Sequence, residues 1–198
     1  MTWDACTGRT VGFLEGMSRE ELIDFKFHIG SCSRFLGHPL MLPEILLHMI
    51  TFQLNEHNRL PSENDFYPQE QRTGLSNLPY FSTVSHSAVW QWNLQDFQQA
   101  TTIANRSLTT MAFLKRRFRF ITQYAQKMLS LLAELKESNY ENDHIATIIK
   151  KEDEWRQRLS DRISQSETYE HQTECMQIRI ENLNTVVCIE KVTSHISC

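Results

Sequence analysis

The sequence has 198 residues, of which 40% are apolar and 22% charged, and it carries a formal net charge of −4. This composition supports a folded core and argues against a general nucleic-acid binder, which usually has a strongly basic face. Five cysteines stand at irregular spacing without a CxxC pair, and the first residues lack a basic stretch followed by an apolar run. We therefore expect reduced thiols, no secretory signal, no membrane span in this chain and a cytoplasmic location.

The first predicted helix begins at a capping box. Ser18 stands three residues before Glu21, so its hydroxyl can accept a hydrogen bond from the Glu21 N–H while the Glu21 carboxylate reaches back. We expect this helix to run to about Ile29 and to end at Gly30, because glycine adopts the left-handed conformation without strain.

A second helix is expected from Pro39 or Pro43 to about Asn55, because proline is tolerated in a first turn, where its missing N–H has no helical partner to lose. Residues 58–89 are rich in Pro, Ser and Asn, and this composition predicts an irregular connector. We therefore divide the chain into an N-terminal helical region at 1–57, the connector at 58–89 and a third region at 90–198.

The third region contains no helix breakers. Neither glycine nor proline occurs after Pro79, and helix-forming residues are plentiful there. This composition predicts long helices, which we place at 94–136 and 143–190. Each exceeds the diameter of a small domain, so two antiparallel helices joined by a short turn are expected. The predicted fold class is mainly α, with short N-terminal helices followed by a coiled-coil-like, stalk-like hairpin.

Each long helix carries an apolar seam with the spacing of a coiled coil. In alternating steps of three and four residues, nine of twelve positions from Leu94 to Leu132 are apolar, and nine of fourteen from Ile145 to Glu190 are apolar or aromatic. We expect a second copy or another partner helix to pack on the second seam, through Trp155, Leu159, Met176, Ile180, Leu183 and Val187. Its weakest stretch is expected at four polar positions: Arg162, Ser166, Tyr169 and Thr173.

Few residues have the spacing of a metal or catalytic site. Glu44 and His48 share a predicted helix face and could supply half of a zinc site, or His48 could be an ordinary core or solvated histidine. Cys32 and His38 could act as nucleophile and base, but no third group orients them, so a structural cysteine is the alternative. Glycine loops that bind phosphate are absent. We expect no catalytic residues and no required cofactor, and metal ligands stay unassigned.

Two kinds of charged cluster each have a functional and an ordinary interpretation. Residues 115–120 (KRRFRF) could meet phosphate, anionic lipid or an acidic partner, or their arginine stems could simply cover apolar neighbours. The acidic groups at 152–154, and those at Glu141 and Asp143, could attract a divalent cation or could form a solvated helix face.

Three stretches occur in the order found in a known family. They are GHPLMLPEILLHM (Gly37–Met49), Arg72-Thr73-Gly74 and MQIRIENLNTVVCIEK (Met176–Lys191). Over these residues the chain resembles the cytosolic region of fungal CorA-like magnesium transporters. The family-like motif residues are His38, Pro39, Pro43, Arg72, Thr73 and Gly74.

The resemblance implies a cytosolic domain whose stalk helix leads into a membrane span, followed by a Gly-Met-Asn tripeptide and a second span. It also implies a homo-oligomer with magnesium bound between cytosolic domains. After Val187 this sequence reads CIEKVTSHISC, with neither span nor tripeptide. We therefore expect a chain truncated before its pore, which assembles or senses cations through weak magnesium binding. A full-length relative would be an integral membrane protein.

A second interpretation is a soluble coiled-coil protein–protein interaction module unrelated to transport, which would use the same seam. An enzyme is disfavoured because neither an acid–base pair nor a cofactor loop is visible. Coding sequence beyond residue 198 separates the first two interpretations, because only the transporter requires two further apolar runs.

Overall fold

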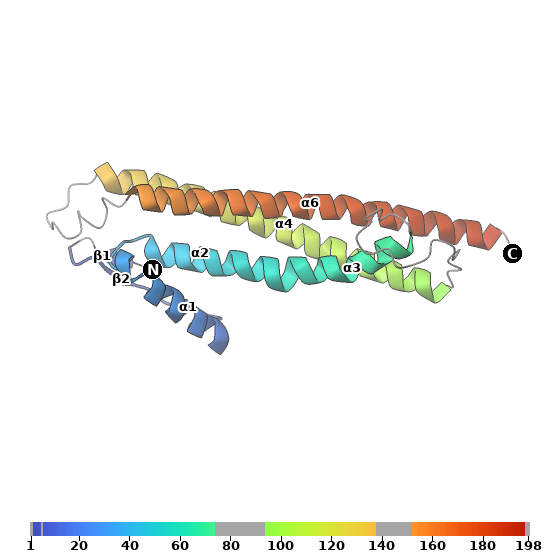
Figure 1. Cartoon of the computed structure of the whole chain (residues 1–198), viewed down its shortest axis with the longest axis horizontal. Coiled ribbons are helices and arrows are strands. Elements are labelled where there is room, and N and C mark those ends of the chain that lie inside the picture. The colour runs from blue at the N-terminus through green and yellow to red at the C-terminus, as the bar shows by residue number, and fades with distance from the viewer. Residues whose placement is uncertain (1, 5, 74–93, 138–151, 197–198) are drawn as a thin grey trace. The chain divides into compact units, whose positions relative to one another are not determined.

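The computed structural model describes residues 2–4, 6–73, 94–137 and 152–196 (Figure 1). The fold is mainly α, as the sequence predicted. Contacts divide the chain into two compact units, which we call the first unit (Met1–Gln53 with Phe118–Thr168) and the second unit (Leu54–Arg117 with Tyr169–Cys198). Each unit thus combines an N-terminal segment with parts of both long helices, a grouping that the three consecutive sequence regions do not contain.

The first unit begins with a β-hairpin that the sequence analysis did not identify. Strands β1 (Thr2–Asp4) and β2 (Arg9–Val11) pair antiparallel, with Trp3 opposite Thr10. The Trp3 indole N–H donates a hydrogen bond to the Gly37 carbonyl oxygen at 3.0 Å. This bond attaches the hairpin to a residue far along the chain, which compensates for the small number of hydrogen bonds that such short strands can form.

Helix α1 (Arg19–Ser31) begins with the predicted capping box. The Glu21 N–H donates to Ser18 Oγ at 3.1 Å, and the Ser18 N–H donates to Glu21 Oε2 at 2.5 Å. The predicted stop at Gly30 is wrong, because Gly30 lies inside the helix. The Cys32 N–H closes the end instead, by donating to carbonyl oxygens of the last turn.

The chain then turns into α2 (Met41–Gln53), whose start lies between the two predicted prolines. A 3₁₀ helix, η1 (Ser33–Phe35), is followed by Gly37 with a φ of 91°. The left-handed glycine in this region is therefore Gly37 rather than Gly30, because the change of chain direction occurs there. In Figure 1, α1 and α2 lie next to each other at the start of the first unit.

In the second unit, a π-helix, η2 (Leu54–Arg59), precedes α3 (Leu60–Arg72). The irregular connector predicted at 58–89 is therefore wrong for residues 58–72, which are helical; its remainder from residue 74 lies outside the described residues. Pro61 is accommodated because it occupies the first turn of α3. Complete burial of Phe66 outweighs the poor helix propensity of its polar neighbours.

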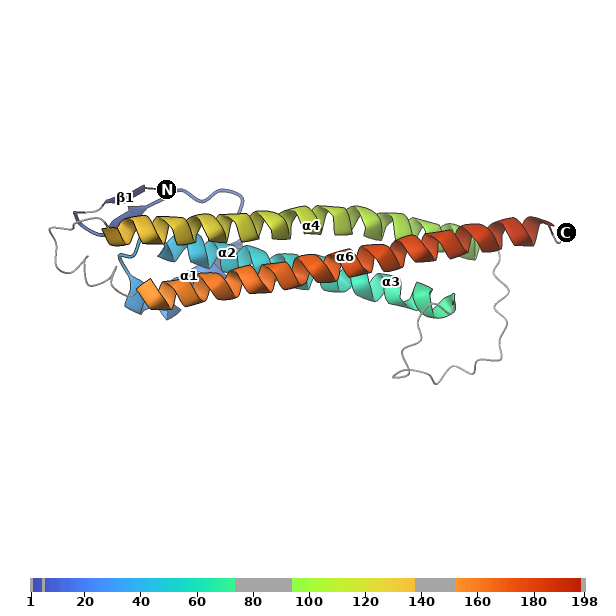
Figure 2. The same cartoon turned by 90° about the horizontal axis from the view of Figure 1, so that it is seen from above.

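The two long helices are α4 (Leu94–Glu137) and α6 (Glu152–Ile196), and α4 ends one residue from its predicted end. They run in opposite directions (Figure 2). In the first unit, the Ser166 hydroxyl of α6 donates to the Phe118 carbonyl oxygen of α4 at 2.7 Å. The predicted pair of long antiparallel helices is thereby confirmed.

The seam predicted along α6 coincides with its buried face. Along α4, only every second predicted position coincides with the centre of the buried face. On α4, every second buried position stands one residue earlier than predicted, for example Ala100 rather than Thr101 and Leu114 rather than Lys115. The buried positions of α4 are Phe97, Ala100, Ala104, Ser107, Met111, Leu114, Phe118, Ile121, Thr122, Ala125, Met128 and Leu132. Half-buried leucines beside this face made two registers look similar in the sequence.

Candidate functional site

The six predicted interface residues of α6 lie inside the chain. Each has an exposed fraction of 3% or less: Trp155, Leu159, Met176, Ile180, Leu183 and Val187. A second chain cannot contact these side chains in this conformation. The predicted partner interface through the seam therefore requires α6 to separate from its own neighbours.

The family-like residues at the start of α2 include one buried histidine. His38 is 1% exposed, and its ring stacks on Trp155 at a centroid distance of 4.4 Å. The Nδ1 atom of His38 accepts a hydrogen bond from the Leu40 N–H at 3.1 Å, so the neutral ring carries its proton on Nε2. Burial lowers the pKa of His38 to about 4. Pro39 and Pro43 are half-buried on either side of the helix start.

The second family-like motif ends α3. The Thr73 hydroxyl donates to the Gln69 carbonyl oxygen at 3.1 Å, and Arg72 Nη2 pairs with Asp96 Oδ1 of α4 at 2.7 Å. The Thr73 bond closes the last turn of α3, and the Arg72 ion pair joins this end to the start of α4 within the second unit. Gly74 lies outside the described residues.

In the first unit, Glu44 is held by two arginines rather than by a metal. Its side chain is 1% exposed; Arg158 Nη2 donates to Oε2 at 2.6 Å and Arg162 Nε donates to Oε1 at 3.2 Å. Because both carboxylate oxygens accept from guanidinium groups, Glu44 does not form the half zinc site with His48 that its sequence spacing suggested. In the described part of the chain, no three or more His, Cys, Asp or Glu side chains are grouped to hold a metal ion.

His48 lies close to this positively charged group. Burial, together with the nearby charges of Arg162 and His28, lowers the pKa of His48 to about 4. The ring of His28 meets that of His48 edge-on at a centroid distance of 4.9 Å. The structure thus supports the alternative interpretation, in which His48 is a packed, neutral histidine.

Cys32 and His38 do not face each other as nucleophile and base. Cys32 is buried, and Arg158 Nη2 approaches its sulfur at 3.6 Å, whereas the His38 ring packs on Trp155. Phe35 also packs on Trp155, at 4.9 Å between ring centroids. This arrangement supports the structural role for Cys32.

The second unit contains its own buried carboxylate, which the sequence analysis did not identify. Glu70 is 4% exposed, and Arg179 Nε donates to its Oε1 at 2.8 Å while a second guanidinium nitrogen meets Oε2. This hydrogen bonding raises the pKa of Arg179. The Arg179 guanidinium also lies over the Phe66 ring, 5.9 Å from its centroid. The two partners are 109 residues apart in sequence, so no local spacing indicates the pair.

The polar middle of α6 is not a weak stretch, because its side chains are satisfied. Ser166 is fully buried and bonds to the Phe118 carbonyl oxygen, and the Thr173 hydroxyl donates to the Tyr169 carbonyl oxygen at 2.7 Å. Arg162 binds Glu44 as described above. Helix α6 continues through these residues without interruption.

The charged clusters are partly neutralised by contacts within the chain. In the basic cluster, Lys115 pairs with Glu174 at 2.6 Å and the Arg117 guanidinium lies over the Phe113 ring. The acidic cluster at the start of α6 forms two ion pairs: Glu152 with Arg156, and Glu154 with Arg34. These contacts favour the ordinary interpretation of both clusters. Glu141 and Asp143 lie outside the described residues.

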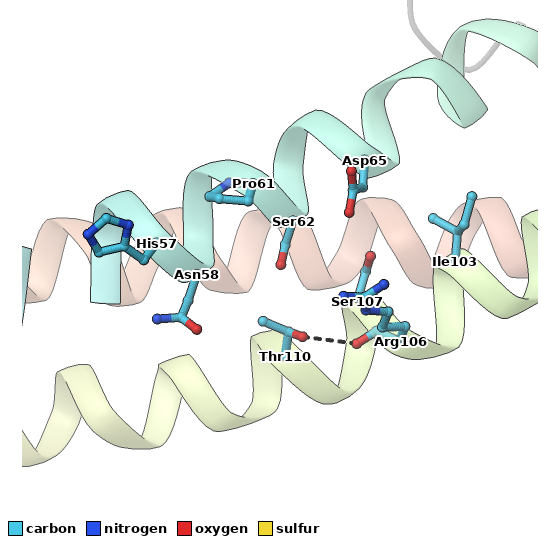
Figure 3. Close-up of a pocket in the computed structure, with 9 residues that line it drawn as sticks. All are labelled: His57, Asn58, Pro61, Ser62, Asp65, Ile103, Arg106, Ser107 and Thr110. Carbon is cyan, nitrogen blue, oxygen red and sulfur yellow. Dashed lines mark hydrogen bonds between the residues drawn. The ribbon is translucent and has the colours of Figure 1, made fainter. Parts of the chain in front are cut away.

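A polar pocket of about 170 Å³ lies in the second unit between η2–α3 and α4 (Figure 3). Its lining residues are His57, Asn58, Pro61, Ser62, Asp65, Ile103, Arg106, Ser107 and Thr110. In Figure 3, Ser62 and Asp65 project from α3 toward α4. Two polar residues, Ser107 and Thr122, lie on the otherwise apolar buried face of α4, and Ser107 is the one that lines the pocket. A polar residue in this face therefore does not by itself mark the pocket in the sequence. π-Helical turns such as η2 often accompany functional sites.

Comparison of the chain with known proteins gave no match. No family model, no curated protein and no solved structure matches it. Within the described ranges, none of the helices combines the length and apolar character needed to cross a membrane. Function is therefore inferred from the residues of the chain itself.

Proposed function

We propose that this chain is the helical extramembrane part of a CorA-like magnesium transporter, acting in assembly or cation sensing rather than in transport. The observation that carries the proposal is the placement of the family-like residues at points that define the fold. His38 is buried before α2, and Arg72 and Thr73 end α3. Side chains at such points determine where the chain turns, so a shared motif there supports a shared fold.

The long helices support the same proposal. Helix α6 is continuous over 45 residues, and its buried seam extends to Val187. In the family that the sequence resembles, a stalk helix of this kind leads to the membrane. The proposed location of the described residues is therefore the cytoplasm.

Weak magnesium binding is proposed for exposed carboxylates at contacts between copies of the chain. The buried carboxylates Glu44 and Glu70 are engaged by arginine side chains, which excludes them as cation ligands in this conformation. A hard divalent cation needs several oxygen ligands. Exposed carboxylates from two or more copies of the chain would supply these ligands when the copies assemble. No catalytic step is proposed.

A protein–protein interaction module is the second candidate, and exposed apolar residues of α1 favour it. Ile23 and Phe27 stand one turn apart and are 59% and 70% exposed, and the preceding Phe13 is 84% exposed. Grouped apolar side chains on a surface are typical of contact regions. Unlike the buried seam of α6, these side chains are accessible to a partner.

Coding sequence and magnesium titration separate the two candidates. The transporter proposal predicts that the transcript encodes, beyond residue 198, two apolar runs of about 20 residues with Gly-Met-Asn after the first. Their absence would favour the interaction module. The sensing proposal also predicts that millimolar magnesium raises the mass measured by light scattering, and an unchanged mass would contradict sensing.

A further inference from the structure

The pocket of the second unit has the size of a small-molecule site. Its volume is about 170 Å³, and an engineered protein cavity of about 150 Å³ holds a benzene molecule. The pocket therefore has room for a ligand of roughly six non-hydrogen atoms. Its lining is mostly polar, which excludes an apolar occupant of that kind.

One wall of the pocket presents a carboxylate. Asn58, Ser62 and Asp65 follow each other at steps of four and three residues, so they share one face of the η2–α3 helix. Among the described residues, the Asp65 carboxylate has neither a hydrogen-bond nor an ion-pair partner. Asp65 is an exposed residue, so water solvates its carboxylate in the absence of a ligand.

The opposite wall presents a guanidinium and a serine hydroxyl, both on α4. The Arg106 side chain has no acidic partner in the described part of the chain, and it does not form an ion pair with Asp65 across the pocket. Ser107 is 4% exposed, and its hydroxyl has no hydrogen-bond partner within the described residues. The Thr110 hydroxyl, in contrast, is already bonded to the Arg106 carbonyl oxygen at 3.1 Å (Figure 3).

We propose that this pocket binds a small zwitterion of the α-amino acid class, whose carboxylate pairs with Arg106 and whose ammonium group pairs with Asp65. A simple anion would pair with Arg106 but be repelled by Asp65. A simple cation would pair with Asp65 but be repelled by Arg106. A zwitterion satisfies both charges at once and offers acceptors to the Ser107 hydroxyl. The proposal does not depend on the transporter assignment.

Three matched probes test the charge requirement on the unchanged full chain. L-Serine carries both charges, L-glycerate has a hydroxyl in place of the ammonium group, and L-serinamide has a neutral amide in place of the carboxylate; the three have the same number of non-hydrogen atoms. In an NMR or calorimetric titration, we expect L-serine to bind with a Kd of about 1 mM, which a ligand of this size reaches with ordinary efficiency. Each of the other two probes is expected to bind at least about tenfold more weakly, because it leaves one pocket charge unpaired.

Two substitutions assign each charge to its partner. Arg106→Gln should remove the preference for L-serine over L-serinamide, and Asp65→Asn should remove the preference for L-serine over L-glycerate. Arg116→Gln is the matched control, because Arg116 is an exposed cation of α4 outside the pocket, and it should leave all three affinities unchanged. The proposal would be overturned if L-serine did not bind saturably or if the three probes bound equally well. It would also be overturned if Arg106→Gln and Arg116→Gln had equal effects.

Discussion

The two units use the same contact, a buried glutamate held by arginine from α6, in different surroundings. In the first unit, Glu44 meets two arginines, Arg158 and Arg162, whose side chains are 29% and 20% exposed. In the second unit, Glu70 meets Arg179, which is 37% exposed. Water therefore solvates the second arginine more than the first two, so breaking the Glu70 pair costs less than breaking the Glu44 pair.

Polar groups outside these pairs are distributed differently as well. The first unit buries three nitrogens without a hydrogen-bond partner among the described residues: His38 Nε2, Trp155 Nε1 and Arg158 Nε. The second unit also buries two oxygens without such a partner, Tyr67 Oη and Gln69 Oε1, and it places polar side chains around an open pocket. Both units therefore bury polar atoms without a partner among the described residues, and the second unit differs in that polar side chains also line a pocket.

Removing the central ring of the first unit should give the largest effect. Trp155→Ala deletes a fully buried side chain that packs on His38 and Phe35. Truncation of a buried aromatic residue costs about 4 kcal/mol of unfolding free energy through lost burial and the remaining cavity. Urea unfolding measures this loss. Trp155→Phe keeps a packed ring and should cost clearly less, and equal losses for the two variants would contradict the packing role.

Removing the charge of Glu44 should give the second-largest loss of stability. Glu44→Gln keeps the shape of the side chain but leaves Arg158 and Arg162 without their carboxylate. We expect a loss of about 3 kcal/mol in the free energy of unfolding, because unpaired charges in a protein interior are costly. Urea unfolding is the measurement. A neutral result would show that water solvates both arginines without Glu44.

Acidification should weaken the first unit through His38. Its pKa is about 4 in the folded chain and 6.5 in the unfolded chain, so only the unfolded chain gains this proton between those pH values. Stability should therefore fall as the pH drops from about 6.5 to about 4, by up to about 3 kcal/mol from this group. Unfolding curves across this pH range measure the slope. His38→Phe, which keeps a ring against Trp155, should reduce the slope by about half, because His48 has the same lowered pKa and contributes the rest. An unchanged slope would contradict the assignment.

The corresponding change in the second unit should be smaller. Glu70→Gln leaves only Arg179, which is partly solvated, and we expect a loss of about 1–2 kcal/mol. Glu63→Gln is the matched control, because Glu63 lies farther from Arg179, at 3.8 Å, and is more exposed. Urea unfolding of the two variants, compared with Glu44→Gln, tests the difference between the units. A Glu70→Gln loss equal to that of Glu44→Gln would contradict it.

The smallest effect is expected at the capping box of α1. Ser18→Ala removes the hydroxyl that accepts from the Glu21 N–H and should cost about 1 kcal/mol. Thermal unfolding followed by circular dichroism measures it. Ser18→Asp should restore most of the loss, because an aspartate also caps a helix, and failure of this rescue would point to a different role for Ser18.

Patterns that repeat along one helix were predictable from the sequence. The α6 seam follows steps of three and four residues from Trp155 to Val187, and the buried side chains confirm its register. The α4 register was less certain because Leu108 and Leu129 place apolar residues beside the buried face. The β-hairpin was missed because its strands have three residues each, too few to show an alternating pattern.

Contacts between distant segments were not predictable from spacing. Glu44 and Arg158 are 114 residues apart, so their pairing depends on how the helices pack. Local spacing therefore suggested Glu44 as a candidate metal ligand, and it placed Arg162 in a stretch expected to be the weakest of the helix. Similarly, the Pro-, Ser- and Asn-rich composition of α3 concealed a helix that burial of Phe66 stabilises. The pocket arises from two helix faces that no single stretch of sequence contains.

The unfolding of Leu183→Asp at a concentration where light scattering shows a single chain tests most directly whether the α6 seam is buried within one molecule. Leu183 is fully buried, and placing a carboxylate there should remove at least about 3 kcal/mol of unfolding free energy even in the monomer. A monomeric variant with the helicity and stability of the unchanged chain would show that the seam is buried only between chains, and would contradict the account.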